Sequence, residues 1–242
     1  MHPKIPGFIA LLFSLSTCLA QTDTINVYVS EWGKRVSTAD SAMYAGKGWK
    51  EGGVWRMNAY FKTGLLRQSG TYADSAFSIH HGELKQFTED GTPQYKAVYF
   101  TNLVTDEEYY YPSGKLKAKG RGMEGLVYAE DGSVLKDAIF RKEAVFPGGE
   151  KAWITYLGAN LNNNIPVKKK APAGRYTVIV RFIIDKKGDI TEVHALNDPG
   201  YGTVKEAVRV ISKGGKWAPA IQFGEPVIYR LQQNITFVVE EK

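Results

Sequence analysis

A short frame built around glycine recurs in the first half of the chain. Its glycines are Gly64, Gly91, Gly114 and Gly132. The aromatic residues that stand four positions before them are Tyr60, Phe87, Tyr110 and Tyr128. Each glycine follows a Thr, Asp or Ser, which favours a tight turn where glycine takes a positive φ at no steric cost. Because one hairpin cannot bury its own apolar face, the frame predicts an elongated antiparallel sheet of stacked β-hairpins.

Two of these units carry a family resemblance. Residues 60–72, YFKTGLLRQSGTY, and residues 110–120, YYPSGKLKAKG, resemble the MORN-like repeats of YwqK-type proteins, whose pattern is YYxxGxLKxxGxY. The resemblance covers residues 55–142 and implies hairpins that serve as a spacer or as a protein-binding surface. The segment that precedes them is expected to add capping strands, with packing roles for Trp32, Trp49 and Trp55.

The pattern changes at the segment FPGG, residues 146–149. A helix is expected from Glu150, and the segment NNNIP is expected to end it by Pro166, since proline cannot continue a helical hydrogen-bond ladder. The apolar face of this helix is predicted to hold Trp153, Ile154, Leu157 and Leu161. Residues 176–184 and 190–196 are predicted strands that the turn DKKGD joins.

A second helix and a final strand follow. Thr203 and Glu206 have the spacing of a capping box, and Gly214 is expected to close the helix. The apolar stripe of this helix is predicted as Val204, Ala207, Val208 and Ile211. Residues 227–239 alternate as a strand does, and one face holds Val227, Tyr229, Leu231, Ile235 and Phe237. The order α–β–β–α–β predicts an α+β unit in which two helices cover one face of a three-stranded antiparallel sheet.

The N-terminal segment, MHPKIPGFIALLFSLSTCLAQ, has the pattern of a secretory signal. A basic start, a short apolar run and small residues predict cleavage after Ala20 and a mature chain that begins at Gln21. Cys18, the single cysteine, would leave with the signal, so no disulfide is expected. The segment LSTC also resembles a lipobox, and lipidation of Cys18 is the alternative. The chain is thus divided into a signal at 1–20, a hairpin-repeat domain at 21–143 and an α+β domain at 144–242, with the two domains folding independently.

The second domain resembles the C-terminal domain of TonB-type energy transducers, in the form common among Bacteroidetes. The residues that carry the resemblance are FPGGEKAWITYLGANL, GRYTVIVRFIIDKKGDITEVHAL, TVKEAVRVISKGGKWAPA and PVIYRLQQNITF. The resemblance implies a periplasmic domain that binds the TonB box of outer-membrane receptors by strand addition near its last strand. The chain departs from the family in having Ile165-Pro166 where Tyr-Pro is usual, and a short signal where transducers have a membrane anchor and a Pro-rich spacer. The resemblance therefore implies a binding mode and not energy transduction.

The chain offers no recognisable catalytic, cofactor or metal motif. Adjacent histidines in a strand, His80 and His81, point to opposite faces and are poor joint ligands. His194 is expected as a strand-surface imidazole, and the carboxylates of residues 106–108 and the lysines of residues 168–170 as solvated charges. A net charge of +6 is too small and scattered to indicate nucleic acid. We expect no enzyme activity, no cofactor and no metal.

The candidate site is the final strand. If it lies at the edge of the sheet, its unpaired backbone groups form a template for an extended peptide. The residues on its outer face, which we predict to contact the partner, are Ile228, Arg230, Gln232, Asn234 and Thr236. The alternative is that the C-terminal tail or a second copy of the chain, as a homodimer, covers this edge. A second function class also stays open: a structural or antitoxin-like inhibitory protein whose hairpin sheet is the working surface.

Overall fold

The computed structural model describes residues 24–30, 35–38, 40 and 42–241. The expected signal at 1–20, with Cys18, and also Trp32 lie outside the described residues. Within the described part of the chain, no helix combines the length and hydrophobicity needed to cross a membrane.

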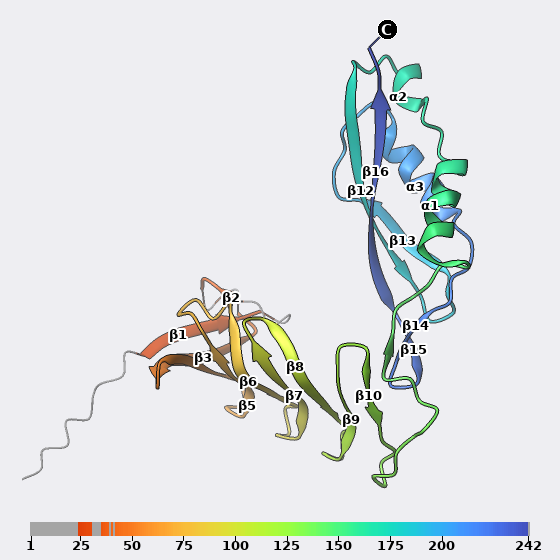
Figure 1. Cartoon of the computed structure of the whole chain (residues 1–242). Helices are drawn as coiled ribbons and strands as arrows, with labels where there is room; N and C mark the ends of the chain where they lie inside the picture. The colour runs from red at the N-terminus through yellow and green to blue at the C-terminus, as the bar shows by residue number, and fades with distance from the viewer. Residues whose placement is uncertain (1–23, 31–34, 39, 41, 242) are drawn as a thin grey trace, which may run out of the picture.

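The first half forms one ten-stranded antiparallel sheet in which nearly every strand pairs with its neighbours along the chain (Figure 1). The strand order is β10-β9-β8-β7-β6-β5-β4-β3-β1-β2. The strands are β1 Thr24–Val29, β2 Arg35–Val36, β3 Tyr44–Glu51, β4 Val54–Tyr60, β5 Leu66–Tyr72, β6 His80–Phe87, β7 Pro93–Phe100, β8 Leu103–Tyr110, β9 Leu116–Arg121 and β10 Glu124–Val127. The predicted long antiparallel sheet is confirmed.

The four glycine turns share one backbone geometry. Their glycines, Gly64, Gly91, Gly114 and Gly132, have φ values of 85°, 85°, 78° and 90°. In the second turn the N–H of Thr88 donates to the carbonyl of Thr92 at 2.9 Å, and the N–H of Gly91 donates back to Thr88 at 3.0 Å. The same pair of bonds occurs in the other three turns. The turn is therefore a structural repeat, and its kinship to the MORN-like family stays a prediction.

Two phenylalanine rings pack directly against the backbone of this sheet at strand glycines, which have no side chain in the way. A Cβ added to Gly48 would lie 2.1 Å from the ring of Phe77. A Cβ at Gly120 or Gly125 would come within 2.8 Å and 2.6 Å of the ring of Phe140. Phe77 packs with Val27, Met57 and Tyr72, and Phe140 packs with Ala118 and Val127. The first half thus has two small cores, one near each end of the sheet.

The second half is an α+β unit with three helices. These are α1 Gly149–Asn160, α2 Ile165–Lys168 and α3 Thr203–Ser212. They cover one face of an antiparallel sheet with the order β13-β12-β16, made of β12 Gly174–Ile184, β13 Ile190–Ala195 and β16 Tyr229–Val239 (Figure 1). A smaller sheet has the order β11-β14-β15 and contains β11 Arg141–Lys142, β14 Ala220–Gln222 and β15 Glu225–Val227. The predicted α+β class and the three-stranded antiparallel sheet are confirmed.

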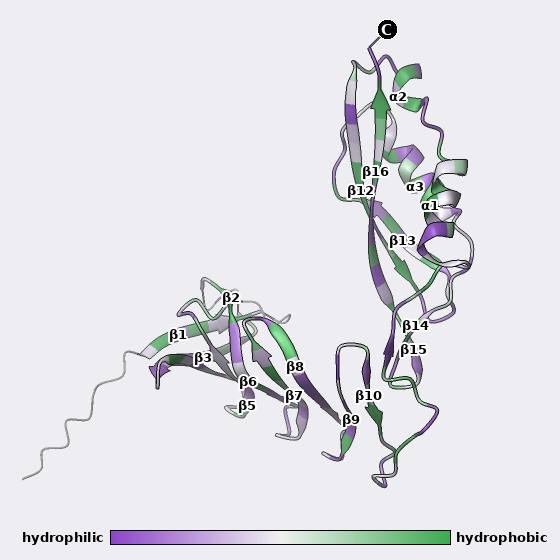
Figure 2. Ribbon diagram, in the orientation of Figure 1, coloured by the Kyte–Doolittle hydropathy of each residue, from purple (hydrophilic) through white to green (hydrophobic). Residues whose placement is uncertain are grey.

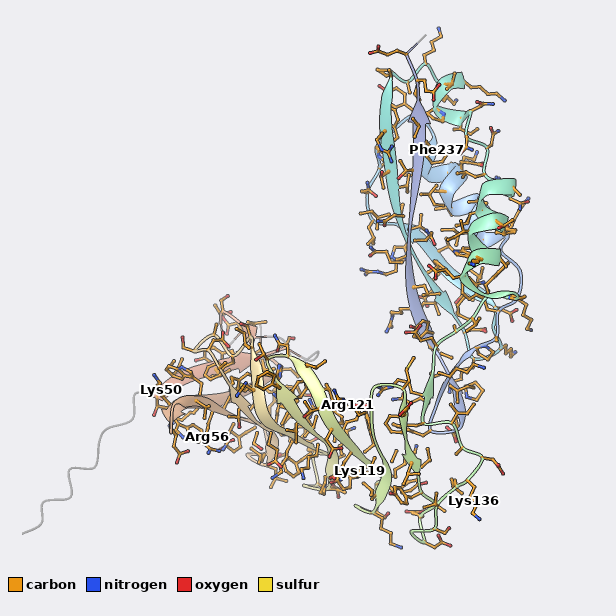
Figure 3. The ribbon with its side chains drawn as sticks, viewed as in Figure 1. Lys50, Arg56, Lys119, Arg121, Lys136 and Phe237 are labelled. Carbon is orange, nitrogen blue, oxygen red and sulfur yellow. The ribbon has the colours of Figure 1, made fainter. Side chains whose placement is uncertain are left out.

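One core lies between this sheet and its helices. Val178, Val180 and Phe182 of β12 are at most 1% exposed, and Phe237 of β16 is fully buried. Figure 3 labels Phe237 on this strand. The hydrophobic residues of β12 and of the C-terminal part of β16 stand out in Figure 2, while the N-terminal part of β16 is mostly hydrophilic. The face predicted for the final strand is confirmed, because Ile235 and Phe237 belong to this core and the partly buried Val227, Tyr229 and Leu231 pack against it.

The first helix differs from the prediction at one point. Ile154 is 59% exposed and does not belong to the buried face, which consists of Trp153 and Leu157. The helix ends at Asn160, so the prediction that it ends by Pro166 is confirmed. Pro166 itself lies in the first turn of the separate short helix α2, where the missing N–H of proline is not needed.

The predicted capping box at the start of α3 is wrong. The helix begins after Gly202, which has a φ of 73°, and Thr203 donates its hydroxyl to the carbonyl of Gly200 at 2.7 Å. Glu206 instead accepts the N–H of Asn162 at 2.7 Å and binds Arg209 at 2.6 Å. Its carboxylate therefore closes the end of another helix. The buried stripe contains Val210 rather than Val208, together with Ala207 and Ile211.

Residues beside the expected domain boundary at 143/144 connect the two halves. Arg141 belongs to β11, which pairs with β14 of the second half, and it lies 3.0 Å from the buried carboxylate of Glu107 on β8. The expectation that residues 106–108 are solvated charges is therefore wrong for Glu107. The ring of Phe223, from the β14–β15 turn, lies 4.6 Å from that of Tyr109 and 5.5 Å from that of Phe140. The junction is therefore a packed contact with one ion pair and not a bare linker.

Candidate functional site: the free edge of the C-terminal sheet

Strand β16 is an edge of its sheet. It pairs with β12 over its whole length, from Tyr229 opposite Ile184 to Val239 opposite Gly174. No strand among the described residues pairs with its other side. The final strand therefore lies at an edge of its sheet, as strand addition requires.

The orientation of the backbone of β12 decides which groups of β16 are free. The N–H of Ile179 bonds the side chain of Asn197 at 2.7 Å, and its carbonyl accepts the N–H of Leu196 at 2.8 Å. Both backbone groups of Ile179 thus point toward β13. Because backbone direction alternates along an antiparallel strand, Val178 and Val180 point toward β16.

The partners of these two valines on β16 are Ile235 and Gln233. Their backbone groups are therefore occupied by β12. By the same alternation, the N–H and carbonyl groups of Gln232 and Asn234 point outward, away from β12. The free edge thus offers alternate backbone donors and acceptors to an incoming strand.

The predicted site residues are distributed as follows. Arg230, Gln232 and Asn234 are exposed on the face away from the helices. Thr236 is half-buried, and its hydroxyl lies 2.9 Å from that of Thr177. Ile228 is 55% exposed and lies between β15 and β16 rather than within the strand. Four of the five residues therefore share one strand face, and Ile228 precedes it.

Gln233 is a functional candidate that the sequence analysis missed. Its side-chain oxygen accepts the indole N–H of Trp153 at 2.9 Å, and its amide nitrogen donates to the carbonyl of Asn234 at 3.0 Å. This second bond occupies one outward carbonyl of the free edge. The one available signal is the polar residue at position 233 among the apolar residues of the inner face.

A cavity of about 350 Å³ opens beside this edge. Leu231, Gln232 and Gln233 form one wall. The rest of the lining comes from Glu143, Val145, Phe146, Glu150, Trp153, Phe182 and Trp217. Burial, and secondarily the carboxylate of Glu143, raise the pKa of the nearby Tyr229 hydroxyl. The indole N–H of Trp217 is buried with no hydrogen-bond partner in the described structure.

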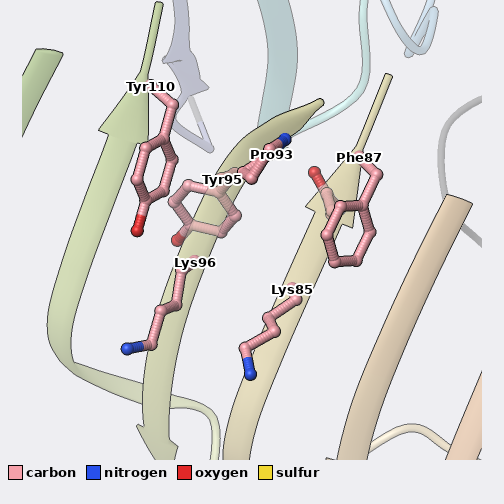
Figure 4. Close-up of a pocket in the computed structure, with 7 residues that line it drawn as sticks. Lys85, Phe87, Pro93, Tyr95, Lys96 and Tyr110 are labelled. Carbon is pink, nitrogen blue, oxygen red and sulfur yellow. The ribbon is translucent and has the colours of Figure 1, made fainter. Parts of the chain in front are cut away.

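A second cavity, of about 260 Å³, lies on the repeat sheet (Figure 4). Phe87, Pro93 and Tyr110 supply apolar walls, and Lys85 and Lys96 line the same space. The lysine charges are paired: Lys85 lies 2.6 Å from Glu83, and Lys96 lies 3.5 Å from that carboxylate. The cavity is therefore aromatic rather than strongly cationic.

The histidines, considered above as possible catalytic or metal-binding residues, lie in separate environments. The imidazole of His80 lies 4.8 Å from the rings of Tyr72 and Tyr99, while His81 faces Phe100. The Nδ1 atom of His194 lies 3.0 Å from the backbone carbonyl oxygen of Glu192. Across the residues that the structure describes, His, Cys, Asp and Glu form no group of three or more that could hold a metal ion.

Residues 174–239 match the family described as the Gram-negative bacterial TonB protein C-terminal. The match begins at the first residue of β12 and ends at the last residue of β16, so it contains the whole edge described above. The family is a non-enzymatic transducer domain of the periplasm that binds the TonB box of outer-membrane receptors. Neither the curated proteins nor the solved structures contain a match to this chain.

Proposed function

We propose that this protein is a periplasmic binding module that recognises an extended segment of an outer-membrane receptor, or of another envelope protein, by strand addition to β16. The contacts would come from the outward backbone of Gln232 and Asn234, with Arg230, Thr236 and Ile228 around them. A role in TonB-dependent transport is part of this proposal, while enzyme activity, cofactors, metals and nucleic acid are not.

The single observation that carries the proposal is the unpaired edge of β16 inside the segment that matches the TonB family. An exposed edge invites pairing with another chain, and natural proteins usually block it. Here the strand is long, and its polar side chains keep it soluble, while among the outward groups of Gln232 and Asn234 one carbonyl, that of Asn234, is occupied by the Gln233 side chain. Strand addition would use these groups for affinity and side-chain contacts for selectivity.

Proline substitutions at the outward positions test the proposal. Gln232→Pro and Asn234→Pro each remove one free N–H without removing a bond to β12, so the fold should survive. Loss of a guest hydrogen bond and the bulk of the ring should weaken binding by about 10-fold to 100-fold. The measurement is titration of a labelled TonB-box peptide against the full chain.

Matched variants separate the backbone from the side chain. Gln232→Ala and Asn234→Ala keep the N–H and should bind nearly as the parent does. Gln233→Pro removes a ladder bond to β12 and should destabilise the sheet itself. If both outward proline variants bind as the parent does, the edge is not the site. If the parent is a dimer that these prolines dissociate, a second copy covers the edge.

A second candidate function uses the repeat sheet as the working surface. The aromatic cavity formed by Phe87, Pro93 and Tyr110 favours it, because such a cavity suits a structural or inhibitory contact with another protein. Phe87→Ser with Tyr110→Ser would remove the aromatic walls. Capture of the envelope partner by the parent but not by this variant would favour the repeat sheet, and capture lost only in the β16 proline variants would favour the edge.

A further inference from the structure

We propose that the cavity beside β16 selects a bound strand with a long basic side chain, lysine or arginine, at the position opposite Gln233 or Leu231. This inference rests on the proposed function, since it assigns the side-chain specificity of the same edge. The proposal follows from the position of the cavity, the chemistry of its walls and its charge.

The position follows from sheet geometry. Residues directly opposite each other on neighbouring strands place their side chains on the same face. The side chains of Leu231 and Gln233 face the helices and line the cavity. A guest residue opposite either of them would therefore enter the cavity, while its neighbours would lie on the outer face with Gln232.

The walls suit the stem of a long side chain. The rings of Phe146, Trp153 and Trp217 contact one another, with centroids 5.1 Å to 5.4 Å apart, so this wall is preformed. Trp153 is also held by its bond to Gln233. Apolar methylene groups gain from burial against such rings, and a cation gains further from their faces.

The charge at the cavity selects a cation. Glu143 and Glu150 both line it, and both are exposed. In the part of the chain that the structure describes, neither carboxylate lies within 4.0 Å of a Lys or Arg nitrogen. Two carboxylates without a cationic partner beside an aromatic wall complement an ammonium or guanidinium group.

Host peptides of alternating threonine and valine, with one central position varied, test the assignment. That position is lysine, norleucine, glutamate or tyrosine, and anisotropy measures binding to the full chain. The lysine peptide should bind about tenfold more tightly than the norleucine peptide, which has the same stem without the charge. The glutamate peptide should bind most weakly, and added salt should reduce the lysine preference.

The Glu143→Gln/Glu150→Gln double variant should remove the lysine preference and leave the affinity for the norleucine peptide unchanged. The assignment would be overturned if the parent bound the lysine and norleucine peptides with nearly equal affinity. It would also be overturned if the ratio of these two affinities were unaffected by the two substitutions. Tighter binding of the tyrosine peptide would overturn it too, because the cavity would then select a hydroxyl beside the Trp217 indole. Gln232→Pro keeps the two failures apart: if it abolishes binding of all the peptides, strand addition stands whatever the lysine ratio, and if it abolishes none, strand addition itself is wrong.

Discussion

The ion pair between Arg141 and Glu107 should hold the last hairpins of the repeat sheet to β11, the strand that pairs with β14 of the second half. The Glu107 side chain is 4% exposed, one of its oxygens lies 3.0 Å from the Arg141 guanidinium as an ion pair without a hydrogen bond, and the other accepts the Tyr109 hydroxyl at 2.8 Å. Arg141 also donates to Tyr109 at 3.1 Å and to the carbonyl of Gly122 at 2.8 Å. Removing the arginine would leave a buried carboxylate without a counter-charge.

Arg141→Ala should therefore lower the free energy of unfolding by about 2–3 kcal/mol, less than the cost of breaking a fully buried pair, because the Arg141 side chain is 30% exposed. Glu107→Gln removes the charge but keeps the shape and the acceptor for Tyr109. Adding this substitution to Arg141→Ala should recover about 2 kcal/mol, because the buried carboxylate is then neutral. Arg121→Ala, at an exposed arginine of β9, is the matched control and should change stability by less than about 0.5 kcal/mol.

Urea unfolding of the full chain, followed by circular dichroism and tryptophan fluorescence, measures these differences. Trp55 reports on the first half, and Trp153 and Trp217 report on the second. An Arg141→Ala variant whose free energy of unfolding is within about 1 kcal/mol of the parent's would refute the reasoning, since leaving a buried carboxylate unpaired should cost more than that. A double variant less stable than Arg141→Ala alone would refute it as well.

Three further predictions concern charge, domains and processing. The hydrogen bonds from Arg209 lower the pKa of Glu206 below its ordinary value of 4.5, so its stabilisation is present above pH 4.5 and disappears as the pH falls through the lower folded value. Glu206→Gln should remove that part of the acid sensitivity in thermal unfolding between pH 5 and 3, and an unchanged pH profile would contradict it. We propose that residues 144–242 fold alone, because this fragment contains every residue of the core between the C-terminal sheet and its helices. A fragment without a cooperative unfolding transition by circular dichroism would contradict this proposal. We also propose that the mature chain begins at Gln21 without lipid, and intact mass of the envelope protein would disprove it by showing a lipidated Cys18.

Local pattern was sufficient for the glycine turns, the two longer helices and the long strands, but not for α2 or the small sheet of β11, β14 and β15. The turn residues before Gly64, Gly91, Gly114 and Gly132 predict hairpins because the positive φ of a tight turn is a property of a few adjacent residues. The alternation along residues 229–239 predicts which face of β16 is buried, because side-chain direction in a strand has a period of two. The same pattern identified Arg230, Gln232 and Asn234 as the outward set.

Contacts between distant residues decided what local pattern could not. Glu206 has the spacing of a capping box, yet it binds Asn162 from another helix, because a longer-range partner competed with the local one. The edge position of β16, the bond between Trp153 and Gln233, and the cavity beside them all depend on how sheet and helices pack. Periodicity within one strand says nothing about which strand pairs beside it, so only the tertiary structure could determine the free edge and the side chains that surround it.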